Sequence, residues 1–549
     1  MTRLRQLDRG VFRIKMSITG TAIDWVEAIS DRMDDPEARP AGSTEPFFPV
    51  SDEVAVSLDH GLHVYHLGDD QLGTGSSFGN ASVWAETKGS GGLLSLFSIE
   101  TGKKIAGGMS LTYLLPFTPL VDRDGAESHP DAFSRTTPSA VGKIHLHPAF
   151  QQHEFVIGDG LHVLETFFVP RTGMDDPASA AQVSLLWNRT AHPTEVIVAA
   201  CLDPRGETPM DMIARYDSAR HALVAWNESE PDQVRVFGAS QPPSGYWATT
   251  DEEEAYSPRR VFPSTTSERG NLTCALQFRL LLLPGQRHKL RIVVSFSPEG
   301  AHKALSIHEI GRSDHLLKHT AAHYSDVVGK AEIEAPDAMV THAVQWAKTC
   351  LLRPIACYPI GMAATNDPGR SSNIVGRDTA WYVHGCDATL PDVACSMLRI
   401  LADYQREDGL IREYINGLDG KTEDYGFNIN DATPLFLMAL AHHIKVTGHW
   451  DCMRALHESA RLAGERILAS LDEKGLVKCT AEGIGPGAIC GWRNVLQNEQ
   501  ITGAVTEVNC ECYAALLSFA DLEKMEGDQA ESARYHREAE KLHTAINQH

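Results

Sequence analysis

Residues 376–405 read GRDTAWYVHGCDATLPDVACSMLRILADYQ, a polar segment that leads directly into an apolar run with helical spacing. Arg377 and Asp378 come just before Trp381 in this segment. Guanidinium and carboxylate groups form paired hydrogen bonds with sugar hydroxyls, and a flat aromatic ring covers the apolar face of a sugar. The segment therefore indicates a carbohydrate site at the entrance of a helix.

A second stretch, residues 425–444, repeats this arrangement. It reads YGFNINDATPLFLMALAHHI, so that Asn430 and Asp431 precede another apolar helical run. We expect the rest of the chain to be organised around these two segments.

The chain has 549 residues, 42% of them hydrophobic, and a formal net charge of −23. This length predicts two large domains. The acidic excess disfavours nucleic acid and an anionic membrane as partners, because both favour basic patches. No stretch reaches the roughly 18 consecutive apolar residues of a membrane span, and the N-terminal segment lacks the apolar core of a signal peptide. We therefore expect a cytoplasmic protein.

The 11 cysteines are scattered, without CxxC or Cys/His ligand spacing. We expect reduced, buried thiols rather than disulfides or zinc, and neither a metal ion nor another cofactor. His442 and His443 lie inside a predicted helix with core-like spacing, and we interpret both as structural.

Residues 46–298 show short alternating runs separated by Gly, Asp and Pro turns, and residues 1–45 form an N-terminal extension. Such runs without long helices between them predict an antiparallel β-sandwich. The clearest predicted hairpins are FVIGDGLHVLETFFV at 155–169 and FRLLLLPGQRHKLRIVVSF at 278–296, and a further one is expected at 54–67.

After Ser297 the hydrophobic spacing changes from two to about 3.6 residues and does not change back. Residues 299–336 are interpreted as a linker helix, centred on Ala301–Tyr324, and residues 337–549 as a helical domain. Successive helices separated by loops rich in Gly, Asp and Asn are typical of a toroidal α/α barrel. The expected helices are Ala338–Leu352, Leu390–Tyr404, Ala432–Val446, Trp450–Leu471, Ala504–Met525 and Ala530–Ile546.

Four motifs within this domain also carry a resemblance. They are HAVQWAKTCLLRPIACYPIGMAATNDPGRSSNIVGRDTAWYV (342–383), EDGLIREYI (407–415), NINDATPLFLMAL (428–440) and TEVNCECYAALLSFADL (506–522). In order and spacing, they resemble the catalytic module of bacterial glycogen-debranching amylo-α-1,6-glucosidases. More broadly, the chain resembles the six-hairpin glycosidases, in which a β-sandwich precedes an (α/α)6 barrel.

The resemblance implies a glycoside hydrolase that acts on an α-glucosidic oligosaccharide or polysaccharide through two carboxylates. It places Arg377 and Asp378 on the terminal sugar and makes Asp431 the general acid, which protonates the glycosidic oxygen. Glu507, in the TEVN segment, is the candidate for the second carboxylate. The other residues that we expect to bind the substrate are Trp381, Asn430, Trp492 and Asn509.

In that family the barrel continues beyond the segment that matches LHTAINQH (542–549), and the general base lies in the continuation. The expected helices make about half of a toroid, because six hairpins need twelve helices. We therefore expect an apparently truncated barrel that hydrolyses α-glucosides poorly by itself, or one that a second polypeptide completes. If the chain is active alone, Glu507 and Glu511 are the first candidates for the base.

Each of these residues has a structural alternative. Arg377 and Asp378 could form an ion pair that holds a loop, Asp431 could only cap the helix that follows it, and Glu507 could only complement a helix dipole. Three other functions stay open: a carbohydrate-binding remnant without activity, a glycoside phosphorylase, and a polysaccharide lyase. The acidic composition disfavours the lyase, because such enzymes bind anionic substrates in a basic cleft.

Overall fold

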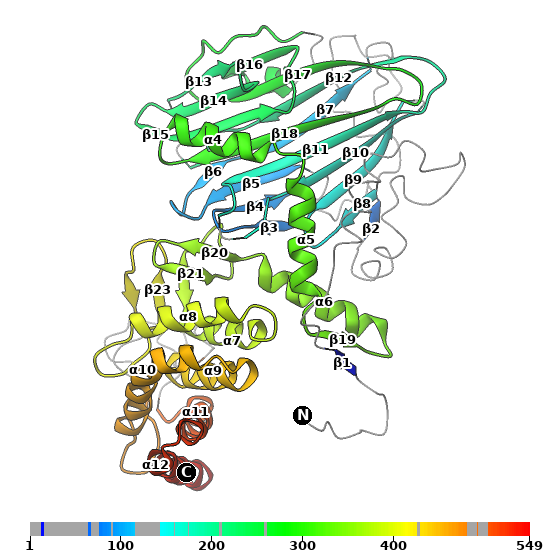
Figure 1. Ribbon diagram of the computed structural model, residues 1–549. Coiled ribbons are helices and arrows are strands. Elements are labelled where there is room, and N and C mark those ends of the chain that lie inside the picture. Colours follow the sequence, from blue (N-terminus) through cyan, green and yellow to red (C-terminus); the bar gives the residue numbers. More distant parts are fainter. Residues whose placement is uncertain are drawn as a thin grey trace. The chain divides into compact units, whose positions relative to one another are not determined.

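The computed structural model describes residues 13–15, 64–66, 76–88, 92–115, 143–158, 160–173, 175–207, 211–256, 261–424, 429–479, 491 and 503–549. The chain forms two compact units, Met1–Pro354 and Ile355–His549. The first unit consists mainly of strands and the second mainly of helices (Figure 1).

The largest sheet of the first unit is antiparallel and has nine strands, in the order β13-β14-β15-β18-β11-β10-β9-β8-β2. The predicted hairpin at 155–169 is confirmed, since β9 and β10 pair with Leu161 opposite Ile157. The strands of this sheet are β2 (Val64–His66), β8 (Lys143–Leu146), β9 (Gln151–Ile157), β10 (Leu161–Phe168), β11 (Ser179–Asn188), β13 (Met212–Asp217), β14 (Ala222–Asn227), β15 (Glu230–Ala239) and β18 (Arg287–Ser297).

Two four-stranded antiparallel sheets complete this unit, in the orders β16-β17-β12-β7 and β3-β4-β5-β6. Every second residue of a strand points to the same face, and in β12 and β18 these alternate residues, such as Val196, Val198, Leu290 and Ile292, enter one buried core that all three sheets share. The strands are β3 (Ser77–Gly79), β4 (Val83–Thr87), β5 (Leu93–Ser98), β6 (Lys104–Ala106), β7 (Met109–Leu114), β12 (Thr194–Leu202), β16 (Gly245–Thr249) and β17 (Thr273–Leu282).

The predicted hairpin at 278–296 is wrong. β17 pairs with β12 and β16, whereas β18 pairs with β11 and β15, so the turn around Gly285 carries the chain from one sheet to another. The Pro-Gly sequence predicts that the chain reverses direction here. It does not specify which strands the two flanking strands, β17 and β18, pair with. The predicted hairpin at 54–67 lies largely outside the described residues.

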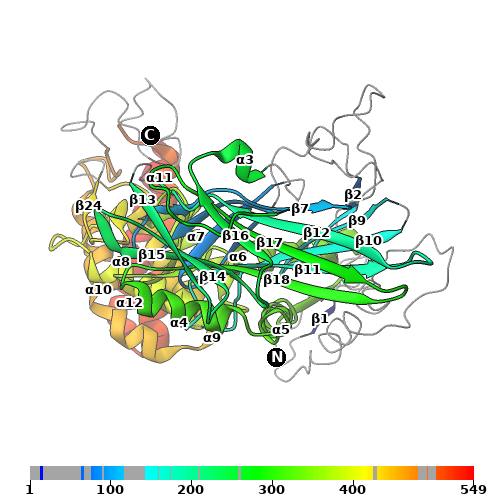
Figure 2. The same cartoon turned by 90° about the horizontal axis from the view of Figure 1, so that it is seen from above.

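The predicted linker helix is two helices, α4 (Ala301–Gly311) and α5 (Leu316–Val328), and the chain turns between them. Ala304 and Leu305 of α4 pack on Val234 and Val236 of β15, and Figure 2 shows α4 lying along this part of the sheet. The remaining elements of the unit are β1 (Arg13–Lys15), α3 (Glu252–Tyr256), β19 (Glu332–Glu334) and α6 (Ala338–Leu352). The unit therefore ends after α6, whereas our domain prediction places this helix in the second domain.

In the second unit, the predicted helices after residue 390 agree closely with the structure, and one helix, α7, was not predicted. Its sequence GRDTAWYVHGC contains two glycines and few apolar residues at helical spacing, so the sequence pattern does not indicate a helix here. The helices are α7 (Gly376–Cys386), α8 (Pro391–Asp403), α9 (Ala432–Thr447), α10 (Trp450–Ala469), α11 (Thr506–Glu526) and α12 (Gln529–Gln548). The short strands are β20 (Ile355–Tyr358), β21 (Gly361–Ala364), β22 (Asn373–Val375), β23 (Tyr414–Asn416) and β24 (Thr422–Glu423).

Two cysteines of this unit correct the expectation of reduced thiols. Cys395 of α8 and Cys452 of α10 form a disulfide. They lie 57 residues apart in the sequence, so only the packing of the two helices brings them together. Among the described residues, no helix is long and apolar enough to cross a membrane.

Candidate functional site

The starts of three helices meet at one place in the second unit. Arg377 lies in the first turn of α7, Asp431 at the N-cap position just before α9, and Glu507 in the first turn of α11. These three residues come from segments that the sequence analysis selected separately. Their helix ends share a positive potential, which favours acidic side chains there.

Arg377 and Asp431 form a paired ion bridge. The Arg377 Nε donates to Oδ2 of Asp431, and Nη2 donates to Oδ1 at 3.0 Å. The Asp431 side chain is only 1% exposed and forms no capping hydrogen bond with α9, although it occupies the cap position. A role in capping alone therefore does not describe Asp431.

Two further carboxyl groups, those of Glu507 and Glu511, lie beside this bridge. The oxygens of Asp431, Glu507 and Glu511 lie within 4.8 Å of one another. Burial, followed by the charges of Asp431 and Glu507, raises the pKa of Glu511 to about 8. Burial also raises the pKa of Asp431, and Glu507 adds to this effect while Arg377 opposes it. At neutral pH the cluster thus keeps a proton, which we assign to Glu511 because the two Arg377 donors favour the charged form of Asp431.

Glu413 is a fourth acid of the site, which the sequence analysis did not single out. It directly precedes β23, is nearly inaccessible to solvent, and has a pKa raised well above the usual value by burial and by the charge of Asp431. The motif EDGLIREYI contains it, but that motif does not show that the side chain turns inward.

Asn430 and Asn509 hold the backbone around the site. The Asn430 Oδ1 accepts from the amide of Gly491 at 2.5 Å, and Arg377 donates to the carbonyl of Gly491 at 2.8 Å. Gly491 has φ +86°, and a Cβ there would collide with the Glu507 carboxylate. Asn509 donates both amide protons to backbone carbonyls, at 2.9 Å each. Both of its amide protons thus hold the backbone, and its expected role in substrate binding stays a prediction.

Asp378 and Trp381 lie on α7 beside this cluster. Asp378 accepts from Asn366 Nδ2 at 2.6 Å, and the Trp381 side chain is 54% exposed. Arg377 and Trp381 are four residues apart, so they share a face of the helix. An exposed indole beside charged groups is suited to the apolar face of a sugar. Trp492 lies outside the described residues.

The spacing of the carboxyl groups limits the mechanism. Inverting glycosidases hold their two carboxyls about 6.5–9.5 Å apart, to leave room for a water on the far side of the sugar, whereas retaining enzymes hold them about 5–5.5 Å apart. Asp431 and Glu507 approach within 4.8 Å. This separation is shorter than the spacing of an inverting pair, so Asp431 and Glu507 as placed here do not support inversion. Three acids at this spacing also resemble a cation site, but Arg377 already neutralises Asp431.

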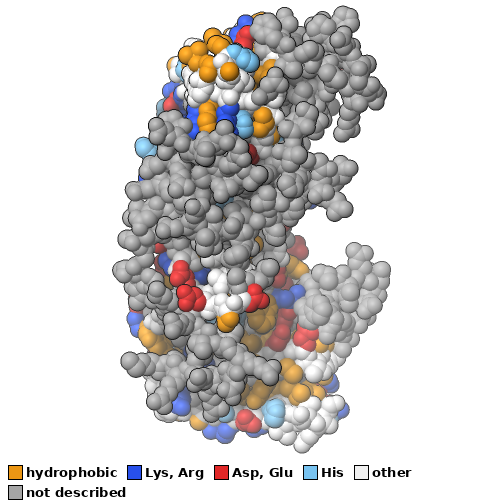
Figure 3. All heavy atoms as spheres, turned by 90° about the vertical axis from the view of Figure 1, so that its right-hand side faces the viewer, with side chains coloured by type: hydrophobic (Ala, Val, Ile, Leu, Met, Phe, Trp, Pro, Cys, Tyr) orange, Lys and Arg blue, Asp and Glu red, His pale blue; other side chains and the backbone are white. Residues whose placement is uncertain are grey.

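Acidic side chains also gather at several places on the molecular surface shown in Figure 3, which agrees with the net charge of −23. A phosphate or a polyanionic sugar would meet a repulsive field there.

Comparisons with known proteins give a match only at the level of the fold. No protein-family model matches the sequence, and no curated protein matches it. The crystal structure of a bacterial glucoamylase complexed with acarbose aligns with a TM-score of 0.51 at 13% identity, over 88% of this chain and 70% of that chain. A putative kojibiose phosphorylase from the human microbiome aligns with a TM-score of 0.55 at 9% identity, over 88% and 69%. This chain therefore shares a fold with these two proteins.

Proposed function

We propose that this chain is a carbohydrate-active enzyme that hydrolyses α-glucosidic bonds. The observation that supports this proposal is the cluster of Asp431, Glu507 and Glu511 beside Arg377, in which burial and the neighbouring acids raise the pKa of Glu511 to about 8 while Arg377 bridges to Asp431. A proton donor beside a carboxylate is what the cleavage of a glycosidic bond requires.

Two residues compete for the role of proton donor. The family resemblance favours Asp431, and its raised pKa supports this assignment. The bridge to Arg377 opposes it, because a carboxylate that accepts two guanidinium N–H bonds holds a proton weakly. Glu511 has the higher affinity for a proton and no such bridge in the described contacts. On the family resemblance we propose Asp431 as the acid, although the proton affinities favour Glu511, and kinetics can distinguish the two.

We further propose that Arg377, Asp378 and Trp381 bind the terminal sugar, and that Trp492 joins them. We infer that the sheets between Ser77 and Ser297 form the β-sandwich domain of a six-hairpin glycosidase, with the helical unit as part of its barrel. Three further points stay predictions: a preference for α-1,6 bonds, a second polypeptide that completes the barrel, and a cytoplasmic location.

The test is to incubate the chain with maltose and isomaltose, with and without inorganic phosphate, and to separate the products by anion-exchange chromatography. Hydrolysis releases free glucose whether or not phosphate is present, and faster release from isomaltose supports the α-1,6 preference. A sugar phosphate that forms only with phosphate would establish the phosphorylase instead, the second candidate that the fold shared with a putative kojibiose phosphorylase favours.

Binding is measured separately by calorimetric titration with acarbose, the ligand of the similar glucoamylase structure. Asp378→Ala should weaken binding about tenfold or more, as loss of a charged hydrogen bond does. The matched control is Asp521→Ala, which removes an exposed acid that pairs with Lys445 on α9. Binding without turnover would support the carbohydrate-binding remnant, and neither binding nor turnover on any α-glucoside would contradict the proposal.

A further inference from the structure

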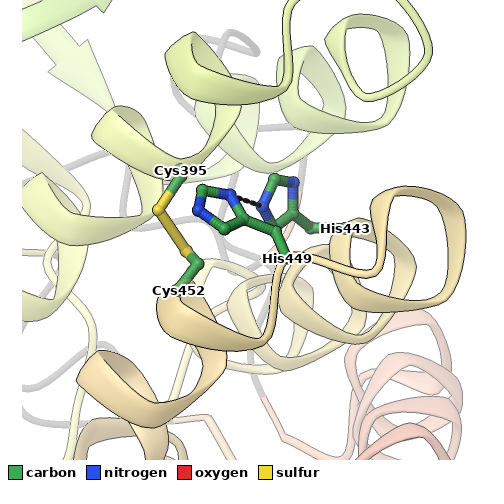
Figure 4. A group of neighbouring side chains, drawn as sticks. All are labelled: Cys395, His443, His449 and Cys452. Atoms are coloured by element: carbon green, nitrogen blue, oxygen red, sulfur yellow. Dashed lines mark hydrogen bonds between the residues drawn. A yellow bond between two sulfur atoms is a disulfide. The ribbon is translucent and has the colours of Figure 1, made fainter.

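Four side chains of types that can bind a metal ion lie close together near the C-terminal end of α9. They are Cys395 on α8, His443 on α9, His449 at the start of α10 and Cys452 on α10 (Figure 4). Two sulfurs and two ring nitrogens, one from each residue, all lie within 4.8 Å of one another. About 12 residues of helix, or ~18 Å, separate His443 from Asp431, so this cluster is distinct from the carboxyl site.

We propose that, when the disulfide is reduced, Cys395, His443, His449 and Cys452 bind a zinc ion. Two thiolates and two imidazoles form one of the ligand sets of structural zinc sites, which hold the metal in tetrahedral geometry. The set would join the three helices α8, α9 and α10 at one point.

The two histidines already have the required spacing. The His443 Nε2 lies 3.3 Å from the His449 Nδ1. Two nitrogens bound to one tetrahedral zinc at about 2.0–2.1 Å are about 3.3–3.4 Å apart. Without zinc these atoms share one hydrogen bond, and with zinc each nitrogen would turn its lone pair to the metal.

A carboxylate behind His443 fixes its orientation. The other nitrogen of this ring, Nδ1, lies 2.7 Å from Oδ1 of Asp387, and neither side chain is accessible to solvent. A proton on Nδ1 that bonds to Asp387 leaves the lone pair of Nε2 directed at the cluster. Zinc-bound histidines commonly donate their second N–H to a carboxylate in this way. Asp387 also bonds to His442 Nδ1 at 2.6 Å, which holds it in place.

The disulfide and the zinc site are alternative states of the same two sulfurs. A small thiol reductant supplies two electrons and two protons to the Cys395–Cys452 disulfide, and is itself oxidised to a disulfide. Zinc then binds both sulfurs as thiolates, and their two protons pass to solvent. A reducing compartment thus favours zinc, whereas an oxidising one favours the disulfide. Either state ties α8 to α10.

The sequence does not reveal this set, because Cys395 and Cys452 are 57 residues apart and the two histidines fall between them. Only the packing of α8, α9 and α10 places the four side chains together.

The test uses the full chain, purified with a thiol reductant, loaded with zinc chloride and freed of excess metal. We expect one zinc per chain by elemental analysis. After replacement by cobalt, we expect the intense visible bands of a tetrahedral ion and a near-ultraviolet band from its thiolate ligands. The oxidised chain should bind no zinc.

His449→Gln removes one ligand from the half-exposed rim, and we expect it to lower zinc affinity at least tenfold. This variant should still form the disulfide when oxidised, so that the count of free thiols shows that it has folded. His457→Gln, on the same helix but paired with Glu523, is the matched control and should keep one zinc. Cys510→Ser, which removes an exposed thiol, should also keep it.

Two results would overturn the proposal. One is a reduced, folded wild-type chain that retains no zinc, and the other is a His449→Gln chain that binds zinc as tightly as the wild type.

Discussion

At the scale of single residues, the main feature of the candidate site is that several acidic side chains lie close together and compete for protons. Asp431, Glu507, Glu511 and Glu413 lie near one guanidinium, that of Arg377. One positive charge does not neutralise four crowded carboxylates, two of which, Glu413 and Asp431, are buried, so some of them stay protonated. A site in which protonated and charged carboxyls coexist at neutral pH is prepared for acid catalysis.

Replacing Asp431 tests its role as the acid. If Asp431 protonates the leaving group, Asp431→Asn should lower turnover of isomaltose about 10²–10⁴-fold and affect an activated aryl α-glucoside much less, because that leaving group needs little protonation. Turnover of both substrates is measured for Asp431→Asn, Glu511→Gln and the exposed control Asp521→Asn. Equal losses on both substrates for Asp431→Asn would assign it a structural role, and a selective loss for Glu511→Gln would make Glu511 the acid.

Glu511 also predicts how stability depends on pH. Its pKa of about 8 in the folded chain exceeds the ordinary glutamate value of 4.5, so the folded state binds the proton more tightly. This contribution is fully present below about pH 4.5 and is lost as the pH rises through 8. We expect Glu511→Gln to match the wild type at pH 5 and to be more stable at pH 9, by about 2 kcal/mol after allowance for partial solvent screening.

Thermal melts at the two pH values measure this difference. Glu526→Gln, which removes an exposed acid of the same helix, should show no such trend. A Glu511→Gln chain whose advantage does not grow between pH 5 and pH 9 would show that this carboxyl does not hold the proton.

At the scale of elements, helix ends determine where the chemistry lies. The carboxyl cluster forms where α7, α9 and α11 begin, and the Cys/His cluster forms where α9 ends and α10 begins. Gly448 lies at the junction between α9 and α10. It ends α9 with φ +68°, and its N–H donates to the carbonyl of Ile444. The position requires a left-handed backbone, which glycine and, less readily, asparagine adopt.

Gly448→Ala isolates the cost of this conformation. An added Cβ would have no atom within 4 Å, so the backbone angle alone should destabilise the chain, by about 1 kcal/mol. Gly448→Asn should cost less. Gly173→Ala is the matched control, because that glycine also has free space and no left-handed backbone. Denaturant unfolding compares the three variants, and a Gly448→Ala chain as stable as the control would contradict the argument.

At the scale of the whole molecule, side-chain contacts within a compact unit connect segments that are far apart in the sequence. In the first unit, Arg353, which follows α6, makes such contacts. Its guanidinium donates to the carbonyls of His147 and Pro148 and to the hydroxyl of Ser76, over more than 200 residues of sequence. It is buried and connects the end of α6 to loops between the strands.

Arg353→Met should therefore destabilise the first unit by about 3 kcal/mol or more, because the buried carbonyls lose their donors. Calorimetry should show a lower unfolding temperature for the transition of that unit, and an unchanged one for the other. Arg269→Met, which removes an exposed arginine paired with Glu228, should leave both transitions unchanged. An Arg353→Met chain with the wild-type profile would show that the contacts are dispensable.

The sequence by itself determined which part of the chain is rich in strands and which in helices, and it identified the polar segments beside the helix starts. Periods of two and 3.6 residues predicted the strand-rich and helix-rich parts, and most helices after residue 390 to within a few residues, since both signals are local in the chain. The GRD, NDAT and TEVN segments pointed to Arg377, Asp431 and Glu507, which the structure brings together.

Only the tertiary structure decided what depends on contacts between distant segments. It decided that β17 and β18 lie in different sheets and that Glu413 is buried. It also decided that the Asn509 side chain bonds to backbone carbonyls and that Cys395 forms a disulfide with Cys452. Strand pairing, burial and the distance between two side chains are set by packing, for which a single sequence carries no local signal. The raised pKa of Glu511 has the same origin, because it comes from burial and from charges on other helices.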